Sequence, residues 1–187
     1  MDNQQLIIGC CNQDLRCQKA LYDWLHPQML GICLRYASDR DQAQDILQEG
    51  FIKVFKKIDT YKGEGSFEGW VRRVVVNSAL EILRKQKKEL ATTFVEESLM
   101  IVDHRANAQE ELQAADILKT IQSLPTAYRM VFNLFAIEGY THKEIAGQLG
   151  ISVNTSYSQY HRAKTLLRRL IETEKKMNVK AASSWII

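Results

Sequence analysis

The chain has 187 residues, enough for one large domain or two small ones, and its 45% hydrophobic and 25% charged residues are ordinary for a soluble globular protein. Only two prolines and no long alternating run of apolar residues indicate an all-α chain. The net charge of +3 is too small to argue for a nucleic-acid partner, so the distribution of charge has to decide that question.

The sequence argues against secretion and membrane insertion. Its start, Met-Asp-Asn-Gln-Gln, lacks the basic segment of a signal peptide, and no apolar run approaches the roughly 20 residues that span a bilayer. We therefore expect a cytoplasmic protein. In the cytoplasm, cysteines without paired Cys-x-x-Cys spacing are typically buried, reduced thiols. We therefore expect no metal site and no cofactor. The cysteines are Cys10, Cys11, Cys17 and Cys33.

The chain begins with two predicted helices. Residues 2–9 form a short one, and Asn12 is placed to cap the second. The apolar stripe of the second helix resumes beyond Pro27 and reaches Tyr36. We therefore expect the proline to bend this helix without ending it.

A third helix is predicted from its capping residues Asp39 and Gln42 to about Ile58. One surface of it is rich in carboxylates. Catalytic carboxylates need a pocket and a perturbed environment, which a regular polar helix face does not offer, so we expect no catalytic residue here. A solvated face and a docking surface for a partner fit the pattern equally well. The polar side chains are Asp41, Asp45, Gln48, Glu49 and Lys53.

Residues 61–65 are typical of a loop, and Ser66 is the predicted cap of a fourth helix. Asn77 is a poor interior residue, so we expect this helix to break near it. Exposed cations beside aromatic rings suit single-stranded nucleic acid, but Phe67 and Trp70 at i, i+3 spacing are more typical of a core. The polar residues predicted to face outward are Arg72, Arg73, Asn77, Arg84 and Lys88.

The composition changes after this helix. Residues 89–107 lose clear periodicity within a mostly acidic stretch, which predicts a linker between two domains. Helices are expected to resume at 108–123 and 125–138, with Pro125 at the start of the latter.

Residues 139–171 predict two helices joined by a short turn. Thr141 and Glu144 form the Thr-x-x-Glu of a capping box, and Gly150 supplies the positive φ that ends the first helix. Ser152 caps the next helix almost at once. This is the pattern of a helix-turn-helix.

The second helix of this pair has two different faces. Opposite its apolar face lies a polar and cationic one, as a helix entering the major groove requires. An ordinary helical hairpin with a solvated face is the alternative, but the capping box, the glycine turn and the basic helix end together favour a recognition helix. The apolar face carries Ser156, Tyr160, Ala163, Leu167 and Leu170, and the polar face carries Asn154, Ser158, His161, Arg162, Thr165 and Arg169.

Three blocks in this order resemble the sigma-70 superfamily, specifically the two-domain extracytoplasmic-function (ECF) sigma factors. Residues 43–55 are similar to the helix that docks on the clamp of bacterial RNA polymerase. Residues 65–77 with Leu83-Arg-Lys85 are similar to the segment that captures and melts the −10 promoter element. The stretch from Leu124 through His161-Arg-Ala-Lys164 resembles the domain that reads the −35 element.

The resemblance implies contact residues and no catalytic ones. Asn77 would read a flipped −10 base, with Trp70 and Arg84 supporting the strand. The −10 residues are Trp70, Arg73, Asn77, Arg84, Lys85 and Lys88; the −35 residues are Asn154, Thr155, Tyr157, Ser158, His161 and Arg162; and the polymerase-binding residues are Asp45, Gln48, Glu49 and Phe51. His161 and Lys164 replace residues that are frequent in the family, so a −35 sequence preference does not carry over.

The sequence as a whole predicts an all-α protein with two small helical domains joined by a flexible linker, the second domain containing the helix-turn-helix. The predicted divisions are a region 2-like domain at 1–88, a linker at 89–107, a region 4-like domain at 108–177 and a tail at 178–187.

By its resemblance, the chain would direct core RNA polymerase, through its clamp and flap, to promoter DNA and assist melting, under the control of an anti-sigma factor and without membrane insertion. A polymerase-independent helix-turn-helix regulator that binds as a dimer is the alternative, but it leaves residues 43–55 and Trp70–Arg84 without a role. An enzyme is a distant third, because no nucleophile–base set, Gly-rich phosphate loop or metal spacing is present.

Overall fold

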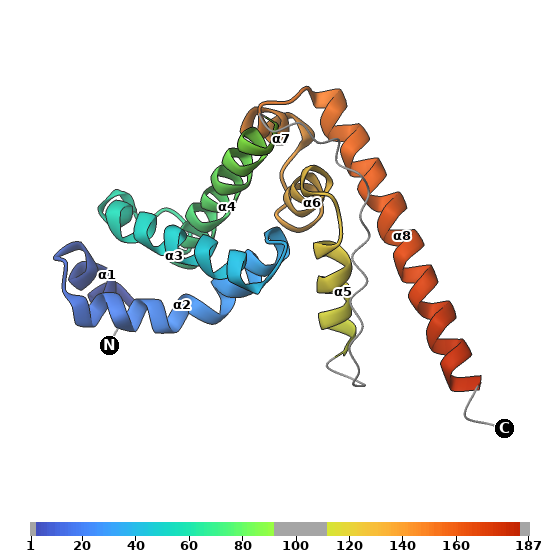
Figure 1. Ribbon diagram of the computed structural model, residues 1–187. Helices are drawn as coiled ribbons and strands as arrows, with labels where there is room; N and C mark the ends of the chain where they lie inside the picture. The colour runs from blue at the N-terminus through green and yellow to red at the C-terminus, as the bar shows by residue number, and fades with distance from the viewer. Residues whose placement is uncertain (1–2, 92–111, 184–187) are drawn as a thin grey trace. The chain divides into compact units, whose positions relative to one another are not determined.

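The computed structural model describes the backbone of residues 3–91 and 112–183 and the side chains of residues 4–86 and 116–173. Every regular element in these stretches is helical, and the chain divides into two compact units, Met1–Val95 and Glu96–Ile187 (Figure 1). The division falls within the predicted linker 89–107, most of which lies outside the described residues. None of the described helices is long and apolar enough to cross a membrane.

The described part of the first unit contains four α-helices and one short 3₁₀ turn. α1 packs against α2, and each of α2, α3 and α4 contacts the other two. The elements are α1 (Asn3–Cys11), α2 (Leu15–Tyr36), α3 (Arg40–Lys57), η1 (Ile58–Thr60) and α4 (Phe67–Ala91).

The turn between α1 and α2 corrects one prediction, because Asp14, and not Asn12, caps α2. The Asp14 carboxylate accepts a hydrogen bond from the Arg16 N–H at 2.8 Å. Gln13 adopts a left-handed conformation with φ of 61°, so the chain uses residues 12 and 13 to reverse direction before the next helix begins. As predicted, α2 continues through Pro27 to Tyr36.

The cap of α3 is as predicted. The Asp39 carboxylate accepts from the Gln42 N–H at 2.8 Å, and the Gln42 side chain accepts from the Ser38 N–H at 2.7 Å. The two bonds satisfy backbone donors on both sides of the helix start, which fixes where the chain enters α3.

The core of the first unit lies where α2, α3 and α4 meet. A Cβ atom at Gly50 would lie 3.1 Å from Cγ2 of Val75, so the glycine permits α3 and α4 to approach closely. The largest fully buried side chains are Leu21, Leu25, Met29 and Tyr36 from α2, Ile46, Leu47 and Val54 from α3, and Val71, Val75 and Val76 from α4.

The expected break of α4 near Asn77 does not occur, and the helix runs from Phe67 to Ala91. Asn77 is exposed, while Val76 and Leu80 on either side of it are buried. A poor helix former costs only up to about 0.7 kcal/mol. Burying the apolar face offsets that cost, since one fully buried aliphatic side chain contributes about 1.5–3 kcal/mol.

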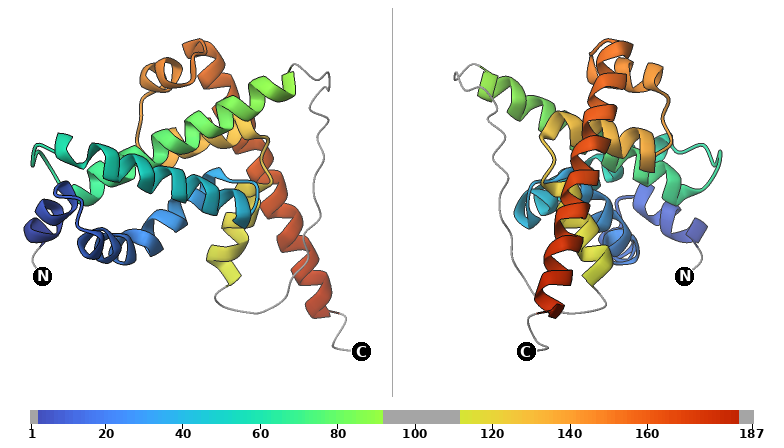
Figure 2. Two further views of the ribbon diagram at one scale, coloured as in Figure 1. Left: turned by 60° about the vertical axis from the view of Figure 1, so that its left-hand side comes forward. Right: turned by 90° about the vertical axis from the view of Figure 1, so that its right-hand side faces the viewer.

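The second unit consists of helices that pack on one long C-terminal helix, as Figure 2 shows. Its elements are α5 (Leu112–Gln122), α6 (Thr126–Phe132), the π-helical segment η2 (Asn133–Ile137), α7 (His142–Leu149) and α8 (Val153–Ser183). The helix predicted at 125–138 is therefore α6 continued by η2. Pro125 precedes its first residue as the N-cap.

The predicted caps of the helix-turn-helix are all present. Thr141 and Glu144 form a reciprocal capping box, and Gly150 ends α7 with φ of 66° and ψ of 37°. The Ser152 hydroxyl then accepts from the Thr155 N–H at 3.0 Å at the start of α8. Three residues, Gly150, Ile151 and Ser152, separate α7 from α8.

A buried arginine holds α5 and α6 together. Arg129 is 3% exposed, and its guanidinium donates to the backbone carbonyls of Gln122, the last residue of α5, and of Leu124 just beyond it. Carbonyls at a helix end lack intrahelical partners, so this cation satisfies them and complements the helix dipole. Beside it lies the apolar cluster of Ile121, Leu124, Ala163 and Leu167, lined by Tyr128, Phe132, Ile137 and Leu166.

Candidate nucleic-acid interface

The polar face predicted on the recognition helix is exposed in α8. Ser156 and Ala163 lie on the opposite side and are fully buried. Thr155 is half-buried, and its hydroxyl bonds to that of Ser152 at 2.8 Å within the helix cap. The exposed side chains are Asn154, Tyr157, Ser158, His161, Arg162, Thr165 and Arg169.

Hydroxyl groups on this face are oriented by the helix itself. Ser158 Oγ donates to the carbonyls of Asn154 and Thr155 at 3.0 Å, and Thr165 Oγ1 donates to that of His161 at 3.0 Å. Because each hydroxyl proton points back to the helix, its lone pairs remain to accept a hydrogen bond from a ligand.

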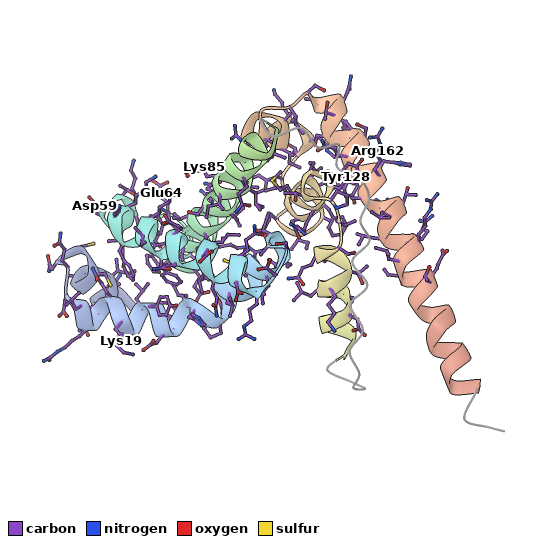
Figure 3. All side chains as sticks on the ribbon, viewed as in Figure 1. Lys19, Asp59, Glu64, Lys85, Tyr128 and Arg162 are labelled. Carbon is purple, nitrogen blue, oxygen red and sulfur yellow. The ribbon has the colours of Figure 1, made fainter. Side chains whose placement is uncertain are left out.

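Arg162 is held by a neighbouring helix. Its Nη1 donates to the Tyr128 hydroxyl of α6 at 3.3 Å, and Figure 3 shows the two labelled side chains next to each other. A guanidinium carries five N–H donors, so this contact orients the group and still leaves enough donors for a bidentate contact with a base.

Sequence reasoning missed His142, which lies under the same surface. Its side chain is 6% exposed, and Nδ1 lies 2.8 Å from the hydroxyl of the fully buried Ser156. The imidazole also stacks on Phe135 at 4.3 Å and makes a tilted contact with Tyr157 at 3.9 Å between ring centroids. Burial lowers the pKa of His142 from its ordinary value of 6.5. This contact joins two helices across a turn, so no single-helix periodicity could reveal it.

The predicted −10 residues lie along α4. Arg73, Asn77 and Arg84 are exposed and fall on one stripe of the helix at about 3.6 residues per turn. Lys85 also projects from α4, where Figure 3 labels it. The side chain of Lys88 lies outside the described residues.

Trp70 belongs to both the core and the surface. It is half-buried and stacks on the buried Phe67 at 5.7 Å, with Tyr61 at 5.9 Å. The Tyr61 hydroxyl donates to the Gly65 carbonyl at 2.7 Å and closes the predicted loop 61–65. Phe67 is therefore a core residue, as its spacing indicated, whereas Trp70 keeps part of its surface accessible.

The carboxylate face of α3 is exposed, with one exception among the predicted contacts. Asp45, Gln48 and Glu49 are exposed, but Phe51 is 3% exposed and packs on Tyr22 at 4.6 Å. Phe51 is therefore a core residue, since its ring lies on the side of α3 that faces α2. On the other flank, Lys53 forms an ion pair with Glu81 of α4.

Three cysteines are buried as predicted, and one is not. Burial raises the pKa of Cys10 to about 11 and that of Cys33 to about 12, so neither thiol ionises near neutral pH. Cys17 is also buried, whereas Cys11 is exposed at the end of α1. Among the described residues, no group of three His, Cys, Asp or Glu side chains is arranged to hold a metal ion.

Comparison with known proteins matches both units. The sigma-70 region 2 model matches residues 21–89, and the sigma-70 region 4 model matches residues 114–167. The solved structure of the sigma factor RpoE in complex with the anti-sigma factor NepR from Bartonella quintana has a similar fold, with a TM-score of 0.53 and 22% identity over 82% of this chain and 96% of that one.

Three curated relatives align with the chain. The RNA polymerase sigma-H factor of Pseudomonas aeruginosa is 26% identical over 91% of this chain and 94% of its own length. The ECF RNA polymerase sigma-E factor of Haemophilus influenzae is 27% identical over 92% and 96%. The ECF RNA polymerase sigma factor SigE of Mycolicibacterium smegmatis is 29% identical over 73% of this chain, which spans 54% of that protein.

A stand-alone helix-turn-helix regulator would account for only the second of the two matched regions. Both models match in the order expected from the sequence, and two relatives align over nearly the whole chain. The chain therefore belongs to the sigma-70 family, as an RNA polymerase sigma factor of the ECF group.

Proposed function

We propose that this sigma factor directs core RNA polymerase to promoters by recognising two elements at once. Residues 1–88 dock on the polymerase and capture the −10 element, residues 108–177 read the −35 element, and residues 89–107 connect them. The observation that carries the proposal is the exposed polar face of α8, which two capped helix ends and a buried opposite face hold in position. Asn154, Ser158, His161 and Arg162 on that face, with Tyr157 and Thr155, are the proposed −35 contacts.

The exposed carboxylate face of α3 is the proposed contact with the polymerase clamp. Asp45, Gln48 and Glu49 share one face at i, i+3 and i+4 spacing, and all three are exposed. The second domain would bind the polymerase flap, as the family resemblance implies. Charged faces of this kind steer association and set its specificity more than they add affinity.

Melting is proposed to occur along α4. Extruding a base from the stack costs a few kcal/mol, which capture of that base offsets. Asn77 offers both a donor and an acceptor for a base edge, and Trp70, Arg73, Arg84 and Lys85 lie on the same helix to hold the strand. Lys88 completes the proposed set. Binding alone drives this step, so we infer that the protein performs no covalent chemistry and is not an enzyme.

The proposed partners also locate the protein. Core polymerase and promoter DNA are in the bacterial cytoplasm, where we infer that this chain acts. Control by an anti-sigma factor stays a prediction from the family resemblance.

Reconstitution with purified core polymerase tests the proposal. The chain should bind core enzyme, and the holoenzyme should start transcripts from a promoter library and enrich two motifs near −35 and −10. The chain alone should bind the same duplexes far more weakly. Tight, sequence-specific duplex binding by the free chain, with no association with core enzyme, would instead support the stand-alone regulator.

A further inference from the structure

The exposed ring of Tyr157 rests on a buried histidine. Tyr157 lies in the first turns of α8 and is 58% exposed, while its ring lies against that of His142 of α7, with centroids 3.9 Å apart and the ring planes tilted by 37°. The N-terminal turns of a recognition helix are the part that reaches base edges in the major groove.

His142 is itself held from two other directions. Its second ring face stacks on Phe135 of the π-helical segment η2 at 4.3 Å and 16°, and Tyr160 meets its edge at 5.8 Å. Nδ1 is hydrogen-bonded at 2.8 Å to the hydroxyl of Ser156, which is fully buried. An imidazole with both faces covered and one nitrogen bonded cannot rotate without breaking several contacts at once.

These contacts form a continuous stack from η2 to the DNA-facing surface. Phe135, His142 and Tyr157 lie in sequence along it, and each comes from a different element: η2, α7 and α8. A tyrosine alone on an exposed helix face samples several rotamers, and binding must then immobilise it. Here the stack fixes the ring before DNA arrives, which reduces that cost.

The stack also decides which part of Tyr157 is left for DNA. His142 lies against the Tyr157 ring, yet Tyr157 is still 58% exposed, which leaves ring carbon atoms for contact with DNA. In the major groove the C5-methyl of thymine is the apolar group on a base edge, and apolar side chains contact it. The hydrogen-bonding edges of other bases gain nothing from an apolar ring edge.

We propose that the His142–Tyr157 stack selects thymine at one position of the −35 element, with Tyr157 as the base-contacting residue and His142 as its positioning residue. The proposal rests on the proposed −35 role of α8 and adds to it a base identity and a buried residue that never touches DNA.

Uracil substitution in the promoter tests the proposal, because it removes only the methyl group of thymine. Holoenzyme first selects a −35 sequence from duplexes with that region randomised. Each thymine of the selected sequence is then replaced by uracil, and affinity is measured for the wild type, Tyr157→Ala and His142→Ala. We expect one thymine at which uracil weakens the wild type about fourfold, the effect of losing one buried methyl-sized group. Neither variant should show a penalty there.

Two further variants separate positioning from general destabilisation. His142→Phe keeps a ring in the stack and loses the bond to Ser156, so it should retain the uracil penalty despite a lower Tm. Ile121→Val shortens a buried side chain in the apolar cluster of α5 and α8, away from the stack, and should lower Tm without changing the penalty.

The outcomes are distinguishable. If the wild-type holoenzyme selects no −35 sequence, the proposed function fails and this inference fails with it. If it selects one and His142→Ala retains the full uracil penalty, or no thymine shows a penalty that Tyr157→Ala removes, only the thymine-selecting stack is overturned.

Discussion

Arg162 shows how a residue of the proposed −35 surface is oriented before any DNA is bound. Its guanidinium donates to the Tyr128 hydroxyl at 3.3 Å, a contact between α8 and α6. The Tyr128 side chain packs against the apolar cluster of the second unit. The orientation of the Arg162 guanidinium on α8 therefore depends on how α6 packs against α8.

Arg162→Ala should weaken −35 binding by roughly 1–3 kcal/mol and relax specificity at one promoter position, if the guanidinium makes a bidentate base contact. Tyr128→Phe removes only the orienting hydroxyl, so it should cause a smaller loss at the same position. Competition binding of holoenzyme to single-base promoter variants measures both. A uniform loss on all sequences with a shallower salt dependence would assign Arg162 to a phosphate.

His142 makes folding of the second unit sensitive to acid. Burial lowers the pKa of His142 in the folded state below its ordinary value of 6.5, so the unfolded chain binds the proton more readily. The resulting stability is fully present above pH 6.5 and is lost as the pH falls towards the folded-state pKa. We expect Tm to fall between pH 7.5 and 5.5 more for the wild type than for His142→Phe. Parallel pH profiles for the two proteins would contradict the prediction.

A substitution at Asn77 tests the proposed base-reading role separately from helix stability. It is exposed in the middle of an unbroken α4, so Asn77→Ala should leave Tm unchanged or slightly raised, because alanine is the better helix former. Polymerase binding and −35 engagement should stay nearly intact, while open-complex formation falls. Permanganate footprinting over a panel of −10 variants measures open-complex formation. If Asn77→Ala discriminates between −10 bases as the wild type does, on closed promoters and on promoters with a pre-opened −10 bubble, the proposed base-reading role is excluded.

At the scale of elements, the turn between α7 and α8 depends on one left-handed residue. Gly150 has φ of 66°, and the Ile151 N–H donates to the Ala146 carbonyl at 3.1 Å in the same turn. A short turn with both sides capped sets the angle between the two helices, and that angle places the recognition face.

Gly150→Ala should destabilise the second unit by about 1–2 kcal/mol, because a Cβ atom disfavours the left-handed conformation. Gly147→Ala is the matched control, since Gly147 is an exposed glycine inside α7 and an added Cβ would meet nothing within 4 Å. This control should stabilise by about 0.5–1 kcal/mol. Urea unfolding measures the free energy of unfolding of both variants. Equal changes in this free energy would show that the left-handed conformation at Gly150 has no special cost.

At the scale of the whole molecule, polar surfaces with different proposed partners are separated onto different helices. The carboxylate face lies on α3, the cationic −10 stripe on α4 and the −35 face on α8. The modest net charge of +3 is therefore a sum over surfaces of opposite sign. Each surface can be altered without removing core residues.

Reversing both charges in Asp45→Lys/Glu49→Lys should weaken association with core polymerase at least tenfold. The free energy of unfolding should stay within about 0.5 kcal/mol of the wild type, as is usual for exposed substitutions. Asp59→Lys/Glu64→Lys makes the same charge change at exposed sites outside α3, labelled in Figure 3, and should leave the association intact. Pull-down on core enzyme without DNA measures both. Equal behaviour of the two proteins would contradict a docking role for the α3 face.

Local features were readable from the sequence, because they depend on residues a few positions apart. The caps at Asp39, Ser66, Thr141 and Ser152, the glycine turn and the two faces of α8 all follow from side-chain hydrogen bonds and helical spacing. The order of the three motif blocks likewise indicated the family. These signals need no knowledge of which helices meet.

Only the tertiary structure decided contacts that join different elements. α4 continues through Asn77 because the residues on either side of it are buried, and Phe51 lies in the core and not on the exposed face of α3. Arg162 is oriented by a hydrogen bond to Tyr128 of α6. His142 became part of the site for the same reason: a histidine at the start of α7 has no special meaning until packing covers it with Phe135 and Tyr157. Such pairings depend on the relative positions of helix axes, which the summed packing of a whole core determines and no single stretch of residues encodes.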